Sequence, residues 1–385
     1  EQHGDLYDVC KPTVDVWYVL QVIIGNELSL RYSMKLHYVK EYEALVEKLV
    51  FGTRFFQHNL HISSSGTASI GFNFNLQDTF TLNRVLDALG FDVAGKKLCA
   101  EALVAERYYI GLLRSSFSQC NGSDLQSLKV VVQNILFARK TDVRYQDFPQ
   151  FKRTDEFILK NKDKGFAIVY AVTKHYERIV DNWLTAFGFD ILKSNSHLLS
   201  RNSRERAVLV SLAAQHVIGV EPDGTPLNIQ LANAFADDDH SEVWFNIRYC
   251  LFDNALPNEV CIKHRYFQSE IFSLYDDAVS PDNISRQQCK KLYAMYNRHK
   301  EQILHFERHY NYLIPEANAE LGLIGKQQIK TLEQSFSTAY NHVRTIPYTS
   351  PPIENFVEQV EEGIEDLINF WAQDDDLDYE IALAS

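Results

Sequence analysis

The sequence has no CxxC pair, no excess of basic residues and no long uninterrupted apolar segment. The six cysteines lie far apart, so their spacing excludes a zinc ribbon or a thioredoxin motif, and we expect most of them to be buried thiols. The net charge is −13 and no basic stripe offsets it, which makes nucleic acid a poor partner. No stretch reaches the roughly 18 to 20 apolar residues that a membrane helix needs, so we expect no membrane span.

Several catalytic and ligand-binding patterns are also missing. There is no glycine-rich phosphate loop, no Gly-x-Ser-x-Gly elbow and no dinucleotide-binding fingerprint. His305 and His309 share a helix face, but Glu307 does not directly follow the first histidine as it does in zinc proteases. We therefore expect these histidines to lie on a solvent-exposed helix face and not to bind a metal. Three consecutive aspartates before Trp244 predict a helix cap and lack the alternating spacing of a calcium loop. We therefore expect no cofactor and no metal.

Aromatic side chains, in contrast, are abundant. The 20 Tyr and 24 Phe residues of this 385-residue chain are sufficient for one large core or two modest ones. Helical spacing covers residues 26–49 and stops at Gly52, a Ser-Ser-Ser-Gly run predicts a tight turn at 63–66, and residues 67–74 alternate as a short strand. Helical patterns follow over 82–89, 96–113, 124–138, 166–187, 202–217, 241–251, 262–276 and 285–310. The sequence thus predicts a mostly α fold (α+β) with one small β element near its start.

Three parts of the chain carry a resemblance to a known family. The first reads SGTASIGFNFNL at 65–76, and the second reads ERAVLVSLAAQ at 205–215. The third reads EVWFNIRY at 242–249, followed by KHRYFQSEIF at 263–272. In type and order these segments resemble the hairpin, the core helix and two later helical segments of the lysozyme superfamily, in its phage-type and pesticin-like branches.

The resemblance implies a small β-hairpin lobe and a larger helical lobe with a sugar-binding cleft between them. We expect the hairpin lobe over residues 36–95 and the helical lobe over 96–345, with an N-terminal extension at 1–35 and an added C-terminal helix within 346–385. The resemblance also implies cleavage of the β-1,4 bond between the amino sugars of peptidoglycan. Three charged residues of the helical segments match the family and are expected to be structural. They are Arg248, Arg265 and Glu270.

Hydrolysis of a glycosidic bond needs an acid for the leaving oxygen and a second group that supplies water or stabilises the transition state. For the pesticin-like branch, the resemblance places the acid at Glu47, a water-positioning hydroxyl at Ser69, and Asn75 where the branch has an Asp. An amide cannot act as a general base, although it can hydrogen-bond a sugar or water. Asp78 would replace it only in a rearranged loop, and Glu47 has the alternative of an ordinary solvated residue on an amphipathic helix.

The shorter phage-type branch aligns differently with this chain. Its Glu-Gly pair corresponds to Phe51 and Gly52, and its Asp corresponds to Ser63, so both carboxylates are missing. The resemblance implies that Ser63, Ser65 and Asn73 contact the substrate. The alternative for the two serines is turn chemistry, which this residue type performs in many proteins.

The segment 346–385 is acidic and amphipathic. Its prolines predict a linker at 347–352, and residues 353–368 place apolar side chains on one helix face and acidic ones on the other. One interpretation is a terminal helix docked on the core with a solvated tail. The other is a partner-docking or export signal, because the acidic tail resembles those of effectors carried by some bacterial type IV secretion systems. We expect peptidoglycan or another glycan as a partner, a protein partner at this helix, and a secreted or translocated protein, or otherwise a cytoplasmic one.

Two functions and one structural alternative stay open at this point. An active peptidoglycan hydrolase would use Glu47 as its acid. A lysozyme-fold protein of a bacterium or phage that lacks this activity would instead serve as an effector, a toxin, or a glycan- or protein-binding module. The substituted hairpin and the acidic composition favour the second function, because the bacterial wall is anionic. The third interpretation is an unrelated helical scaffold whose segments match by chance.

Overall fold

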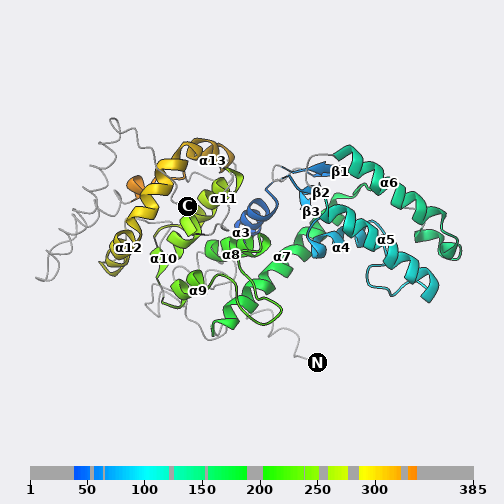
Figure 1. Ribbon diagram of the computed structural model, residues 1–385, viewed down its shortest axis with the longest axis horizontal. Coiled ribbons are helices and arrows are strands. Elements are labelled where there is room, and N and C mark those ends of the chain that lie inside the picture. The colour runs from blue at the N-terminus through cyan, green and yellow to red at the C-terminus, as the bar shows by residue number, and fades with distance from the viewer. Residues whose placement is uncertain are drawn as a thin grey trace, which may run out of the picture. The chain divides into compact units, whose positions relative to one another are not determined.

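The computed structural model shows a mostly helical protein with one small three-stranded antiparallel sheet of order β1-β2-β3 (Figure 1). The residues that it describes are 39–52, 56–63, 66–120, 125–151, 155–188, 203–237, 239–250, 259–275, 286–321 and 328–335. The predicted mostly α fold with a small β element near its start is confirmed. The lysozyme-like part of that prediction stays a prediction.

The chain divides into two compact units, each with its own buried residues. The hairpin unit consists of Lys40–Asn182 and Val210–His216. The C-terminal unit contains the described parts of Trp183–Leu209 and of the chain from Val217 onward. The predicted hairpin lobe (36–95) and helical lobe (96–345) divide the chain differently, and this division stays a prediction.

The hairpin unit begins with helix α3 (Val39–Val46), which passes directly into the π-helical turn η1 (Glu47–Phe51). Within this segment Val46, Leu49 and Phe51 are buried. Gly52 ends the turn with φ of 72°, a left-handed conformation that costs glycine nothing because it has no Cβ. The predicted helix stop at Gly52 is confirmed.

The sheet follows immediately and is built from three short strands. These are β1 (Gln57–Ile62), β2 (Ala68–Gly71) and β3 (Phe74–Asn75). The register places Ser69 opposite His61 on one side and opposite Asn75 on the other. Four side chains of the β2–β3 region are completely buried and supply the core of this layer. They are Ala68, Ile70, Phe74 and Leu76.

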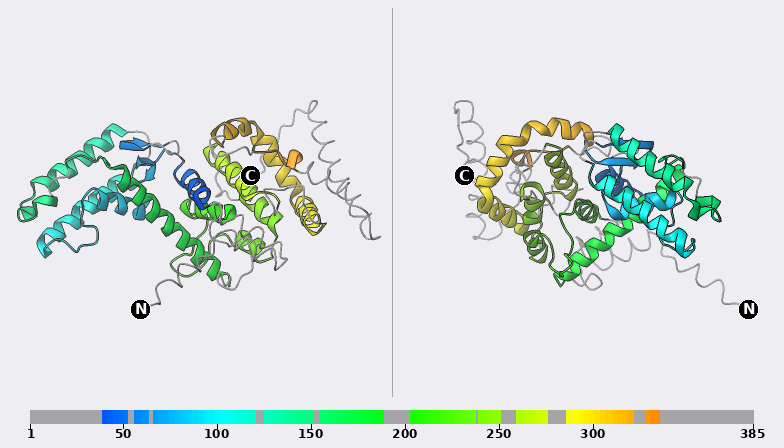
Figure 2. Two further views of the ribbon diagram at one scale, coloured as in Figure 1. Left: turned by 180° about the vertical axis from the view of Figure 1, so that it is seen from behind. Right: turned by 45° about the vertical axis from the view of Figure 1, so that its right-hand side comes forward.

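Four helices and two 3-10 turns follow the sheet in the hairpin unit, which also contains the end of helix α8 (Arg204–Ala214) from Val210 onward. They are α4 (Thr79–Ala88), α5 (Ala100–Ser118), α6 (Leu125–Thr141), η2 (Val143–Tyr145), η3 (Pro149–Phe151) and α7 (Lys162–Ala186), whose last residues belong to the C-terminal unit. Helices α5 and α6 lie side by side (Figures 1 and 2). The predicted helix start at residue 96 is wrong. The carboxylate of Asp92 accepts hydrogen bonds from the backbone amides of Lys96, Lys97 and Leu98 and thereby holds these residues in a loop.

The first turns of α7 lie very close to aromatic side chains of the hairpin. A Cβ added at Gly165 would lie 2.4 Å from Phe56 Cε2 and 3.1 Å from Phe72 Cε2. The rings of Phe56 and Phe72 are 5.0 Å apart, and Phe166 lies 4.9 Å from Phe72 on the other side. A glycine inside a helix costs up to about 1 kcal/mol relative to alanine, and this close approach is what the glycine permits.

The C-terminal unit is entirely helical in its described elements, apart from an isolated bridge between Val220 and Pro226. The elements are α8 (Arg204–Ala214, up to Leu209), α9 (Ile229–Ala236), α10 (His240–Phe245), η5 (Asn246–Cys250), α11 (Glu259–Phe272), α12 (Arg286–Tyr310), η7 (Asn311–Leu313) and α13 (Ile314–Leu321). Helix α10 packs against α9 and α12, and α11 packs against α13. Of the aspartates predicted to cap α10, Asp239 does so: its Oδ1 accepts a hydrogen bond from the amide of Glu242 at 3.2 Å.

Charged side chains occupy the core of the C-terminal unit. Arg248 is completely buried and its Nη2 lies 3.2 Å from Glu307 Oε1, which also accepts a hydrogen bond from the hydroxyl of Tyr249 at 2.8 Å. Arg265 is buried as well and donates from Nη1 to Gln268 Oε1 at 2.6 Å. Burial raises the pKa of Glu270 above its ordinary value.

Candidate functional site

The residues predicted to carry catalysis lie around η1 and the hairpin. Glu47 is the first residue of η1 and is partly exposed. Phe51, which the shorter branch alignment places at the acid position, is only 3% exposed and meets the ring of Phe74 edge-on at 5.5 Å. The position that the shorter alignment assigns to the catalytic acid is therefore occupied by an aromatic core residue. The only carboxylate within η1 is that of Glu47, one turn earlier.

Asn73 connects the end of η1 to the hairpin. It lies in the turn between β2 and β3 with φ of 68°, a conformation that asparagine tolerates better than most residues. Its Nδ2 donates to the carbonyl of Phe51 at 3.1 Å, and its Oδ1 lies 3.2 Å from His61 Nε2. Both ends of the amide predicted to bind substrate are therefore engaged within the protein.

Ser69 and Asn75 are cross-strand neighbours, so the structure brings these two predicted residues together. Ser69 is completely buried, and its hydroxyl donates to the carbonyl of Thr67 at 3.4 Å. Asn75 is exposed, and its Oδ1 accepts a hydrogen bond from the amide of Gln77 at 2.9 Å, as in an Asx turn. Neither residue offers a carboxylate, and the hydroxyl of Ser69 is not accessible to solvent.

Ser63 takes part in the turn that joins β1 to β2. Its hydroxyl lies 2.7 Å from the hydroxyl of Thr67 and also accepts a hydrogen bond from the amide of Thr67 at 3.2 Å. The amide of Ser63 donates in turn to the carbonyl of Thr67 at 2.9 Å. These bonds are the turn chemistry considered as the alternative for this residue. Ser65, the other serine predicted to bind substrate, lies outside the described residues.

Asp78, the nearest downstream carboxylate, serves as the cap of α4. Its Oδ2 accepts a hydrogen bond from the amide of Thr81 at 2.7 Å. The ring of His175 lies parallel to Phe80 at 3.8 Å, and burial lowers the pKa of this histidine while the charge of Asp78 opposes the shift. His61 also contacts Asn73, and His175 stacks on Phe80; these partners are separated along the chain, and no local sequence pattern predicts them.

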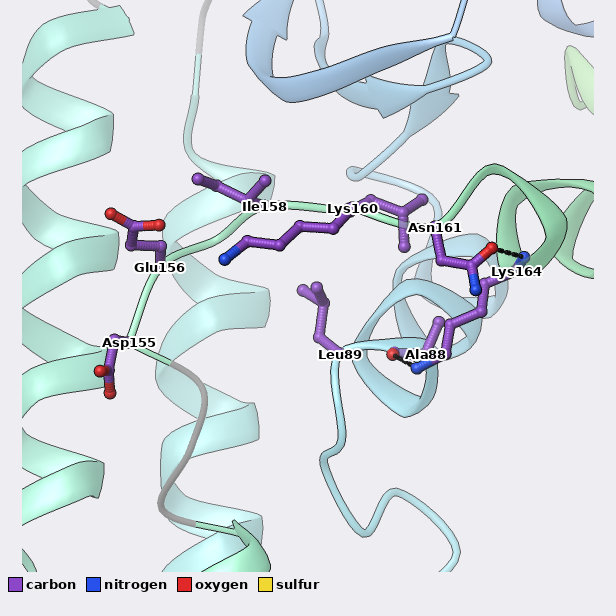
Figure 3. Close-up of a pocket in the computed structure, with 9 residues that line it drawn as sticks. Ala88, Leu89, Asp155, Glu156, Ile158, Lys160, Asn161 and Lys164 are labelled. Carbon is purple, nitrogen blue, oxygen red and sulfur yellow. Dashed lines mark hydrogen bonds between the residues drawn. The ribbon is translucent and has the colours of Figure 1, made fainter.

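A pocket of about 440 Å³ opens elsewhere in the hairpin unit (Figure 3). It lies between the end of α4 and residues 155–161, which precede α7. None of the predicted site residues is among the nine that line it. Its lining is mainly polar and includes two lysines and two carboxylates.

Within the ranges that the structure describes, no group of three His, Cys, Asp or Glu side chains could hold a metal ion. His305 and His309 do stack at 4.3 Å, and Nδ1 of His309 lies 2.7 Å from the carbonyl oxygen of His305. Burial lowers the pKa of His305. None of the helices in the described part of the chain is both long enough and apolar enough to cross a membrane.

Comparison with known proteins gave no match to this chain, whether with models of protein families, with curated proteins or with solved structures. The case for a function therefore comes from the residues of the chain itself.

Proposed function

We propose that this protein is a lysozyme-like, glycan-binding module that does not hydrolyse peptidoglycan. The observation that carries the proposal is the state of the hairpin. At the positions that correspond to the family's hairpin groups, the side chains are buried or bonded within the protein, and none of them is acidic. Hydrolysis with an oxocarbenium-like transition state depends on a pair of groups flanking the bond, usually two carboxylates.

The residues of the hairpin support a binding role in place of a catalytic one. Exposed amide and imidazole side chains lie on strand β1 and at the end of β3, and such groups donate and accept hydrogen bonds without proton transfer. The exposed residues are Gln57, His58, Asn59 and Asn75. Gln57 and Asn75 are held by pairing with β2. His58 and Asn59 lie where the register with β2 is irregular and are held instead by the Leu159 amide and by the bridge to Ile158, so these groups are in position before a ligand arrives.

The resemblance in the helical segments supports the same proposal. Residues 207–213 of α8, which belong to the second resembling segment, are at most 1% exposed. In the third resembling segment, Trp244, Arg248 and Tyr266 are also buried. The segments that resemble the family are therefore core segments, where sequence similarity reflects packing.

The test is to incubate the full-length protein with purified, insoluble peptidoglycan and to measure turbidity, soluble reducing ends and co-sedimentation. We expect saturable co-sedimentation with no turbidity loss and no reducing ends above the buffer control. Glu47→Gln is the decisive variant, and Glu101→Gln is its matched control at an exposed glutamate of α5 in the same unit.

Three outcomes separate the alternatives. Turbidity loss that Glu47→Gln abolishes and Glu101→Gln leaves intact would establish the hydrolase and overturn the proposal. Absence of both cleavage and co-sedimentation would also overturn it, because no glycan is then bound. Co-sedimentation that is equal for the wild type and both variants, without cleavage, is the result that the proposal requires.

A further inference from the structure

We infer that the pocket between α4 and the start of α7 binds a small organic oxyanion, a carboxylate or a phosphate carried on a short apolar group. This inference is independent of glycan binding by the hairpin. The pocket volume of about 440 Å³ lies within the range of small-molecule sites, which is roughly 300–1,000 Å³. The nine lining residues belong to one unit, the hairpin unit.

The backbone that carries the pocket is held by the sheet. Asn59 of β1 forms an antiparallel bridge with Ile158, and the amide of Leu159 donates to the carbonyl of His58 at 3.0 Å. Leu159 is 1% exposed, so this strand-like segment is anchored by its side chain as well. Lys160 and the residue after it therefore project from a fixed backbone, which lowers the entropy lost when a ligand binds.

Three hydrogen-bond donor groups point to an anion. Asn161 Oδ1 accepts hydrogen bonds from the amides of Asp163 and Lys164, at 2.7 and 3.3 Å, which leaves its Nδ2 as a donor with no described acceptor. The ammonium of Lys164 donates to the carbonyl of Ala88 at 2.7 Å and retains two further protons. Lys160 extends across the pocket toward Glu156 (Figure 3), and its ammonium forms no ion pair or hydrogen bond within the described residues.

The acidic residues of the rim offset the charge of the two lysines only in part. The carboxylate of Asp155 is paired with Lys140 at 2.8 Å. Glu156 is therefore the one carboxylate among the lining residues without a partner in the described chain, against two lysines. Charge-assisted hydrogen bonds to a bound oxyanion would satisfy Lys160 and Lys164 together, while the partly buried side chains of Leu89 and Ile158 offer contact to a short alkyl chain.

The ligand is tested with probes of matched shape and different charge. Butyrate, butyl phosphate and butylammonium are titrated into the full-length protein, and the methyl resonance of Ile158, assigned with Ile158→Val, reports occupancy. We expect saturable shifts with at least one of the two anions and none with butylammonium. Affinity is expected to be roughly millimolar, because water and salt screen exposed charges. Comparison of butyrate with butyl phosphate decides between a carboxylate and a phosphate ligand.

Lys160→Gln is the decisive variant, because this ammonium is exposed and forms no hydrogen bond or ion pair within the described protein, so its removal is expected to leave the fold unchanged. Binding should weaken by about tenfold or more. Lys96→Gln, at an exposed lysine outside the pocket, is the matched control and should bind as the wild type does. The inference is overturned if neither anion gives a saturable shift, if butylammonium binds equally well, or if Lys160→Gln binds like Lys96→Gln.

Discussion

Both units bury an arginine against a glutamate, but the two pairs are satisfied to very different degrees. In the hairpin unit, Arg139 binds both carboxylate oxygens of Glu106, at 2.7 and 2.9 Å, and its remaining nitrogen donates to the carbonyl of Phe151. Glu106 also accepts hydrogen bonds from the hydroxyl of Tyr145 at 2.5 Å and from the amide of Asp92 at 2.7 Å. Every polar atom of this pair has a partner.

The pair in the C-terminal unit has the same composition and fewer bonds. Arg248 makes a single 3.2 Å contact with Glu307, and its Nη2 also donates to the carbonyl of Lys330 at 2.8 Å. Its Nε and Nη1 are buried without a hydrogen-bond partner among the residues that the structure describes, and its guanidinium lies 4.5 Å from the ring of Tyr266. Two buried ion pairs of one type thus differ in how completely their charges are bonded, and we expect their contributions to stability to differ accordingly.

The largest expected effect follows from removing the charge of the well-satisfied pair. Glu106→Gln leaves the buried Arg139 without a counter-charge and should lower the free energy of unfolding of the hairpin unit by about 3 kcal/mol or more. Urea unfolding of the variant measures the loss. Glu101→Gln, on the same helix but exposed, is the control and should change the value by less than about 0.5 kcal/mol. Equal losses for the two variants would contradict the prediction.

The same change in the other unit should cost less. Glu307→Gln removes the charge that faces Arg248 but keeps an amide oxygen that can accept hydrogen bonds from the Tyr249 hydroxyl or the Leu332 amide. The guanidinium of Arg248 also keeps its interactions with the ring of Tyr266 and the Lys330 carbonyl. We expect a loss of about 2 kcal/mol, measured as before, with the exposed Glu301→Gln on α12 as control. A loss as large as that of Glu106→Gln would mean that the number of hydrogen bonds does not decide the outcome.

The partly buried His175, which has no bonded counter-charge, should make stability depend on pH. Burial against Phe80 holds the pKa of His175 below its ordinary value of 6.5. As the pH falls through this region, the unfolded chain binds the proton first, so stability decreases from about pH 6.5 down to the lower folded pKa. His175→Gln should flatten this decrease in the hairpin unit, and His309→Gln should leave it unchanged. Parallel curves for the wild type and His175→Gln between about pH 7 and 5 would refute it.

The smallest effect is expected for an exposed ion pair. Lys140 and Asp155 lie 2.8 Å apart, but their side chains are 47% and 54% exposed. Asp155→Asn should therefore lower the free energy of unfolding by less than about 0.5 kcal/mol, and added salt should reduce the difference further. A loss comparable to that of Glu307→Gln would show that exposure does not weaken the pair.

Local patterns predicted much of the fold. The pattern over 285–310 corresponds closely to α12 (Arg286–Tyr310), and the Ser-rich turn followed by alternation gave the hairpin at β1 and β2. The single helix predicted over 241–251 is instead α10 followed by the π-helical turn η5. An apolar spacing of three to four residues does not distinguish these two forms over a single turn.

The contacts that define the candidate site were less accessible from the sequence. The pairing of Ser69 with Asn75 was not predicted, because the single strand expected over residues 67–74 is divided by the turn at Asn73 into β2 and β3. Whether Ser69 faces solvent depends on the layers packed behind the sheet, and the structure buries it. The partner of Arg248 is Glu307, 59 residues later, and one sequence without relatives contains no signal for such a pairing.

Because Gly165 has no Cβ, α7 can approach the aromatic side chains beside the sheet more closely than any other residue at this position would allow. Gly52 is needed for its positive φ, whereas Gly165 lies within a helix and is needed only for the space that the ring of Phe56 occupies. The Cβ of an alanine at this position would clash with the ring of Phe56 and push α7 away from the hairpin. Because Leu159 is bonded to β1 shortly before α7 begins, the displacement would reach the strand edge and the pocket beside it. One glycine thus sets the alignment of two structural layers.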